Sequence, residues 1–150
     1  MAIGDSKIHS QYDLKAYEGD YDNSNDVFKY VIITEGFSSI DEDATAIGIA
    51  NFTKVASSGN YVQDTTLANT SWTRTGGVST LTFDSFSFAA DGANPTTGKT
   101  IAIYNDTSAN KDVLKLVDMT VDGGTTAADT TLGLTYTVNG SGSVRVTSNV

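Results

Sequence analysis

The chain contains no cysteine, one proline and one histidine in 150 residues. Without cysteine it cannot form a disulfide framework, a thiolate zinc site or a cysteine nucleophile. The histidine, His9, lies in a polar N-terminal stretch, where we expect water to reach it. A catalytic imidazole needs a partner that orients it, so we interpret His9 as an ordinary surface residue. No nucleophile elbow, P-loop or zinc-protease motif occurs, and we predict no catalytic residue and no enzymatic activity.

Long apolar runs and positive charge are also scarce. No apolar stretch approaches the roughly 20 residues that span a bilayer, and the N-terminal MAIGDSKIHS lacks the apolar core of a signal peptide. Nine basic residues stand against 18 acidic ones, so the net charge is −9. Such a surface repels nucleic-acid phosphates and anionic membranes. We therefore expect neither as a partner, and we expect synthesis in the cytoplasm without export.

Composition favours β-structure. Thr suits a half-buried pleated surface, and the 14 glycines suit turns. The length fits one domain with a sizeable core. About seven to nine short strands can be recognised, with turn signals between them. The sequence predicts an all-β fold, a single β-sandwich or jelly-roll-like barrel over residues 17–150, preceded by an extended N-terminal arm over residues 1–16.

The most strongly patterned strand is VFKYVIIT, residues 27–34. Its apolar side chains alternate between two faces, with Phe28, Tyr30 and Ile32 on one face. Val27, Val31 and Ile33 are expected on the other. A strand that is apolar on both faces is central and covered on both sides.

Turn residues predict two hairpins and one interruption. Gly76-Gly77 joins NTSWTRT to VSTLTF, and Asn139-Gly140 joins LGLTYTV to SVRVTSN. The apolar side chains occupy odd-numbered positions before residues 84–85 and even-numbered positions after them. This change of face predicts a bulge or a strand break there.

One short helix is predicted near residues 40–51. Ser39 and Glu42 have the spacing of a capping box, and Ile40 and Ile47 fall on one helical stripe. Gly48 is unfavourable inside such a helix.

The acidic stretch over residues 20–26 resembles the start of a calcium loop. An EF-hand loop that begins at Asp20 requires glycine in the sixth place and glutamate in the twelfth, and these places hold Asn25 and Val31. We interpret the stretch as a solvated acidic turn. No metal and no cofactor is predicted. Pairs of carboxylates are uninformative in a chain with 18 of them.

Two segments without evident chemistry are candidates for partner contact. The arm has no period of 2 or 3.6, so we expect it to lie along a neighbouring molecule and bury its apolar side chains there. In IAIYNDTSANKDVLKLVDM, residues 101–119, two strands present a polar loop, 105–112, that suits a contact surface. The candidate partner-binding residues are Ile3, Ile8, Tyr12 and Leu14 of the arm and Asn105, Asp106 and Lys111 of the loop.

Taken in order, DVFKYVIIT, GNYVQDTTLANTSWT and IAIYNDTSANKDVLKLVDM resemble a widespread group of tailed-phage virion structural proteins. Members have a K-V-A-L-L-T-like strand, a G-Y…L-A-N segment, an A-V-I-Y-N-D-T strand and loop, and a closing hairpin. The similarity runs from about Asp26 to about Val146. It departs from the pattern at LVDMTVDG, where Met119 replaces the common Phe or Leu-Gly ending, and the arm lies outside it.

The resemblance implies a head decoration (cement) protein. Such a protein is made in the host cytoplasm and resides on the capsid surface. It binds the outer surface of the major capsid protein lattice, often as a homotrimer at local symmetry axes, and stabilises the head. Two alternatives remain open. One is a tail or fibre component, which copy number per particle would separate, and the other is a carbohydrate- or receptor-binding β-sandwich module, which a glycan array would detect.

Overall fold

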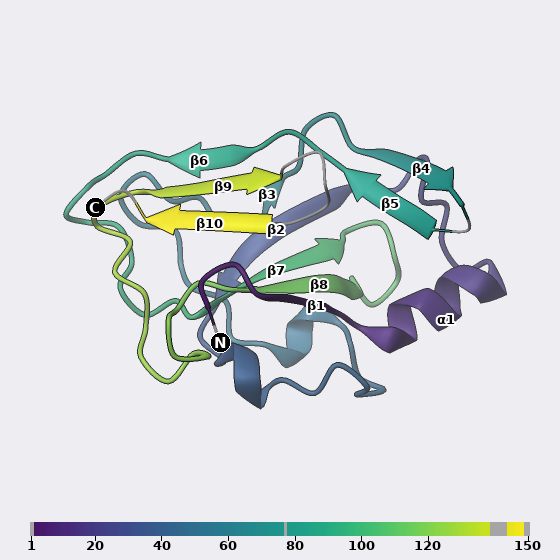
Figure 1. Cartoon of the computed structure of the whole chain (residues 1–150), viewed down its shortest axis with the longest axis horizontal. Coiled ribbons are helices and arrows are strands. Elements are labelled where there is room, and N and C mark those ends of the chain that lie inside the picture. Colours follow the sequence, from purple (N-terminus) through teal and green to yellow (C-terminus); the bar gives the residue numbers. More distant parts are fainter. Residues whose placement is uncertain (1, 77, 139–143, 149–150) are drawn as a thin grey trace.

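The protein has two packed β-sheets, an additional hairpin and a short helix, as seen in the computed structural model, which describes residues 2–76, 78–138 and 144–148 (Figure 1). The larger sheet is antiparallel and has the order β1-β8-β7-β2-β3. Its strands are β1 (Ser6–Ile8), β2 (Phe28–Ile33), β3 (Thr65–Thr66), β7 (Thr100–Asn105) and β8 (Val113–Asp118). The predicted all-β, sandwich-like fold is confirmed.

The second layer is a three-stranded sheet of order β10-β9-β6, with the β4–β5 hairpin beside it. The strands are β4 (Ser71–Thr75), β5 (Val78–Thr82), β6 (Phe86–Phe88), β9 (Leu134–Val138) and β10 (Val144–Ser148). Both predicted strand pairs form, and β5 and β6 belong to different sheets, as the parity change at residues 84–85 indicated. The Asn139-Gly140 turn lies outside the described residues.

Strand β2 occupies the interior of the larger sheet, between β7 and β3. Phe28, Tyr30 and Ile32 enter the cluster between the two sheets, whereas Val31 and Ile33 enter a second cluster on the opposite face. The predicted central strand is therefore confirmed. The prediction was wrong for Val27, which precedes β2 and is 42% exposed.

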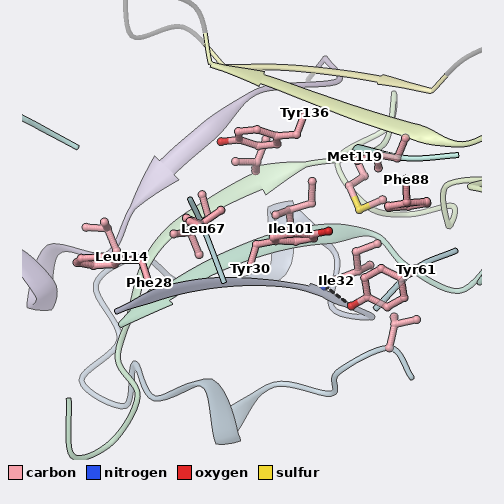
Figure 2. Close-up of a cluster of buried hydrophobic side chains, with 14 of the residues drawn as sticks. Phe28, Tyr30, Ile32, Tyr61, Leu67, Phe88, Ile101, Leu114, Met119 and Tyr136 are labelled. Atoms are coloured by element: carbon pink, nitrogen blue, oxygen red, sulfur yellow. Dashed lines mark hydrogen bonds between the residues drawn. The ribbon is translucent and has the colours of Figure 1, made fainter. Parts of the chain in front are cut away.

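Aromatic rings join the two sheets across the main core (Figure 2). Tyr30 of β2 stacks on Phe86 of β6 with ring centroids 3.7 Å apart, and Phe86 stacks on Tyr136 of β9 at 4.5 Å. Both pairs of rings are within 10° of parallel. Because each ring comes from a different strand, the stack fixes the position of the smaller sheet over the larger one.

The hydroxyl of Tyr136 predicts an unusual response to mutation. It is buried without a hydrogen-bond partner in the part of the chain that the structure describes, and burial raises the pKa of this phenol. A buried donor without an acceptor costs about 1–3 kcal/mol. We therefore expect Tyr136→Phe, which keeps the stacked ring, to raise the free energy of unfolding by about 1 kcal/mol in urea titrations.

Tyr61 provides the matched control, because its buried hydroxyl accepts a hydrogen bond from the Ile32 N–H at 3.0 Å (Figure 2). Removing this acceptor leaves a buried N–H unpaired, so Tyr61→Phe should destabilise by about 1–2 kcal/mol. Equal losses in the two variants would contradict the assignment of the Tyr136 hydroxyl as unpaired.

The outer face of the larger sheet is covered by the segment 36–60, which is largely irregular. Two 3₁₀ turns, η1 (Phe37–Ser39) and η2 (Ile49–Asn51), help to deliver Phe37, Ile40 and Ile49 to the second cluster. The helix predicted near residues 40–51 is wrong.

No α-helix forms near residues 40–51 because the residues that suggested it make other contacts. The Ser39 hydroxyl donates to the Gly36 carbonyl at 2.7 Å, and the Glu42 carboxylate pairs with Lys7. Gly48 is extended and bridges to Asp112, so close to the loop that a Cβ at residue 48 would lie 2.7 Å from the Asn110 carbonyl oxygen. The segment is therefore held by the sheet beneath it and not by a helical ladder.

The N-terminal segment forms regular structure instead of the predicted extended arm. β1 pairs with β8 from Ser6↔Val117 to Ile8↔Lys115, and α1 (Ser10–Glu18) follows directly. The helix ends at Gly19, whose φ of 85° is the left-handed conformation that glycine adopts most readily. No helix in the described part of the chain is long and apolar enough to cross a bilayer. Residues 1–16 thus contribute an edge strand and most of a helix to the domain.

Candidate functional site

The four apolar residues proposed for partner contact in the N-terminal segment have different environments. Ile3, Ile8 and Leu14 are 38%, 50% and 51% exposed. Tyr12 is 1% exposed, stacks on Tyr21 with centroids 4.5 Å apart, and belongs to the main core. Tyr12 therefore has a structural role, and the other three remain available to a partner.

The loop 105–112 is held by its own side chains. Asn105 is fully buried, and its Oδ1 accepts hydrogen bonds from the backbone N–H groups of Thr107 and Ser108 at 3.0 and 3.2 Å. Its Nδ2 donates to Asp26. Asn105 thus organises the loop from inside and does not face a partner.

Asp106 is the electrostatic centre of the same loop. Its carboxylate pairs with Lys29 at 2.7 Å and Lys111 at 2.5 Å, and these two ammonium groups, Lys111 first, hold its pKa below the usual value. The Lys111 side chain remains 51% exposed. Of the three candidates in the loop, Lys111 is the one most open to a partner.

A partly buried ion pair connects α1 to this loop. Lys15 Nζ lies 3.0 Å from Asp112 Oδ2, and the Tyr21 hydroxyl donates to the same oxygen. Asp112 is 3% exposed, and its Oδ1 is buried without a partner among the described residues. Beside this pair lies an open hollow of about 530 Å³, bounded by Lys15, residues 45–51 and residues 109–112. We call this hollow the loop-side recess. The N-terminal segment and the loop 105–112 both contribute to its lining, and α1 and this loop lie at the same end of the molecule (Figure 1).

His9 was predicted to be a surface residue, and the structure corrects this. It is 1% exposed, at the junction of β1 and α1. Its Nδ1 lies 3.1 Å from the Glu42 carbonyl oxygen, which also accepts the Ser10 N–H at 3.0 Å. Its Nε2 is buried and has no hydrogen-bond partner within the described residues. Burial is the main cause that lowers the pKa of His9, and it outweighs the Glu42 carbonyl, which raises it. The ring therefore anchors the N-terminal segment to residues 40–43.

This environment predicts a loss of stability on mild acidification. The folded pKa of His9 lies below the usual histidine value of about 6.5, so the unfolded chain binds the proton more readily. The contribution of His9 is complete above about pH 6.5 and is lost as the pH falls through and below that value. Lys7 opposes protonation and Asp41 and Glu42 favour it, but neither carboxylate reverses the direction.

The measurement is urea unfolding at about pH 7.5 and about pH 5.5, in wild type and in His9→Gln. We expect the wild-type free energy of unfolding to fall between the two pH values and the variant to change much less. Glu42, whose pKa is lowered chiefly by hydrogen bonding and by Lys7, loses its contribution only at more acidic pH. A wild type with the same stability at both pH values would contradict the assignment.

The acidic stretch 20–26 serves local structure. The Asp22 carboxylate accepts the Ser24 N–H at 3.2 Å and the Asn25 amide at 2.7 Å, and Asp26 accepts from Asn105. Within the described residues there is no group of three or more acidic or histidine side chains that could hold a metal ion. The carboxylates therefore fix a turn and connect it to the loop 105–112.

A second hollow, of about 480 Å³, lies between α1 and the β4–β5 hairpin. Tyr17 of α1, 88% exposed, and Trp72 of β4 are two of its walls. The Trp72 ring lies 6.1 Å from that of Phe28, and its Nε1 is buried, with no hydrogen-bond partner among residues 2–76, 78–138 and 144–148. We call this hollow the aromatic groove. The sequence analysis did not find it, because its walls come from three separated segments.

Comparison of the chain with protein-family models, with curated proteins and with solved structures found no match. The resemblance to phage virion proteins therefore rests on the sequence motifs alone.

Proposed function

We propose that the chain is a structural protein of a tailed-phage virion, a head decoration protein that binds the outer surface of the major capsid protein lattice as a homotrimer. Its role is assembly and stabilisation of the head, without catalysis. The observation that carries the proposal is the position of the motif-bearing segments. DVFKYVIIT contains β2, and IAIYNDTSANKDVLKLVDM contains β7 except for its first residue, Thr100, together with β8 and the loop between them. The segments therefore form adjacent strands that support one rigid loop.

The loop-side recess has the physical character of a contact surface. Asn105 and Asp106 fix the loop internally, so a partner would meet a preorganised surface and little entropy would be lost on binding. Lys111 lines the recess and is exposed, and Leu14 is exposed on α1, the helix that contributes Lys15 to the recess. An exposed apolar side chain and an exposed charge at the same end of the domain suit the docking of a lattice subunit.

Copy number in purified particles tests the location. Quantitative mass spectrometry of virions from the phage that encodes the chain should give a copy number comparable to that of the major capsid protein. A handful of copies per particle would support the tail or fibre alternative, and absence from particles would refute the virion assignment.

Surface substitutions test the contact. We expect Leu14→Asp combined with Lys111→Glu to lower retention on particles at least about tenfold. The first substitution replaces an apolar side chain with a carboxylate, and the second reverses the charge of the side chain. Val62→Asp is the matched control: Val62 is 61% exposed but precedes β3, at the edge of the sheet opposite β1. Retention is measured by co-sedimentation of purified protein with particles that lack it, and equal loss in the control and the double variant would count against the recess.

The second candidate is a carbohydrate- or receptor-binding module. The aromatic groove favours it, because the exposed ring of Tyr17 and the partly buried ring of Trp72, beside polar side chains, are suited to ligand recognition.

A further inference from the structure

The aromatic groove is formed by rigid elements. On one side α1 contributes Tyr12, Asp13 and Tyr17, and on the other the β4–β5 hairpin contributes Trp72 (Figure 1). Tyr12 is anchored by its stack on Tyr21, and the Trp72 ring packs beside Phe28 of the main core. The positions of both walls are therefore set by the core, and a ligand would enter a preformed site.

The aromatic side chains offer flat apolar faces with polar edges. Tyr17 is 88% exposed at the rim, although aromatic side chains of this size usually bury most of their surface. Nothing in its own helix requires an aromatic residue at this exposed position. Tyr and Trp provide large contact area with few rotatable bonds, so little entropy is lost when a ligand packs on them.

The remaining lining is partly apolar, from Ile8 and Ala16, and partly neutral and polar. Thr73 and Ser79, which each carry a hydroxyl, line the hairpin side, and both residues are exposed. Asn23 accepts the Tyr12 hydroxyl with its Oδ1 at 3.1 Å, so it offers a ligand its amide N–H groups.

The charge of the groove restricts the ligand. Asp13 is the one charged side chain among the described residues that line it, and the whole chain carries a net charge of −9. Phosphorylated, sulfated or carboxylated ligands would be repelled. A neutral molecule that carries both hydroxyl groups and C–H faces suits a lining that combines aromatic rings with polar side chains.

We propose that the aromatic groove binds a neutral oligosaccharide, with sugar rings packed against Tyr17 and Trp72 and hydroxyls bonded to Asp13, Asn23 and the hairpin hydroxyls. The proposal rests on and deepens the second candidate function, a carbohydrate-binding module, and it does not depend on the virion assignment. The groove gives the protein a second binding surface, distinct from the loop-side recess.

Trp72 makes the test direct, because it is the only tryptophan of the chain. Intrinsic fluorescence is titrated with maltohexaose, cellohexaose, chitohexaose and mannohexaose, and we expect a saturable change with at least one of them. Tyr17→Ala should weaken that binding at least about tenfold. Asp13→Asn should also weaken it. Leu14→Ala, an exposed change on the same helix outside the groove, should leave the affinity unchanged.

Three results would overturn the proposal. The first is no saturable change with any of the four probes up to about 10 mM, well above the concentrations at which weak lectin-like sites fill. The second is an equal loss of affinity in Leu14→Ala and Tyr17→Ala. The third is tighter binding of an aromatic-rich peptide than of every saccharide, which would make the groove a protein-docking surface. Since the assay uses purified protein without particles, its failure is distinguishable from failure of the capsid assignment.

Discussion

Replacing Phe28 with alanine should lower the free energy of unfolding by about 3–5 kcal/mol. Phe28 is 1% exposed on the central strand β2, and its ring packs into the core between the two sheets, 6.1 Å from the ring of Trp72. Removing the ring leaves a cavity that stiff strand backbones on both sides cannot close. Domains of this size are stable by about 5–15 kcal/mol, so the loss is a large part of the total.

Urea titration followed by circular dichroism measures the effect. The adjacent residue provides the control: Val27 is 42% exposed and precedes the strand, so Val27→Ala should cost less than about 1 kcal/mol. If Phe28→Ala lost no more stability than Val27→Ala, the placement of β2 at the centre of the fold would be wrong.

The same strand shows what a sequence can reveal. A continuous apolar run with β-branched residues has few low-energy arrangements other than a strand covered on both faces. The parity of Phe28 and Val31 then assigned each to the correct cluster, because a strand has a strict period of two. The β4–β5 hairpin followed from local turn chemistry at Gly76 in the same way, since that glycine adopts a φ of 59°.

The N-terminal helix was not predictable by such local rules. An isolated helix as short as the nine residues of α1 is marginal in water, and its stability comes from tertiary contacts. Here those contacts are made by Tyr12 with Tyr21 and by Lys15 with Asp112, 97 residues away in sequence. The helix predicted near residues 40–51 failed for the converse reason, since a suitable local pattern was overridden by packing on the sheet.

The candidate site was predictable in location more than in detail. The loop 105–112 was recognised because strong strands flank a polar segment, and it does lie near α1. The sequence did not reveal that Asn105 turns inward, because an asparagine can organise a loop or face solvent with the same neighbours. The aromatic groove was missed because Tyr17 and Trp72 are 55 positions apart and belong to elements whose packing no local pattern encodes.

Mutation to alanine should change the free energy of unfolding very differently at two tyrosines of the same helix. Tyr12 is 1% exposed and donates its hydroxyl to Asn23, whereas Tyr17, five residues later, is 88% exposed. We expect Tyr12→Ala to cost about 3 kcal/mol or more in free energy of unfolding, by loss of a buried ring and its stacking partner. Tyr17→Ala should change it by less than about 0.5 kcal/mol, because a solvent-facing ring contributes little to the folded state.

The two tyrosine variants also show how binding to particles should be tested. If residues 2–14 were an independent arm, their deletion would leave the melting temperature nearly unchanged. With β1 paired to β8, and with His9 and Tyr12 buried, deletion should instead unfold or strongly destabilise the domain. Loss of binding by the truncated protein would then report only on folding. Thermal unfolding of Tyr12→Ala and Tyr17→Ala distinguishes the two cases, and equal melting temperatures would restore the independent arm. With the expected difference, attachment must be measured with substitutions of exposed side chains, such as Leu14, that leave the helix folded.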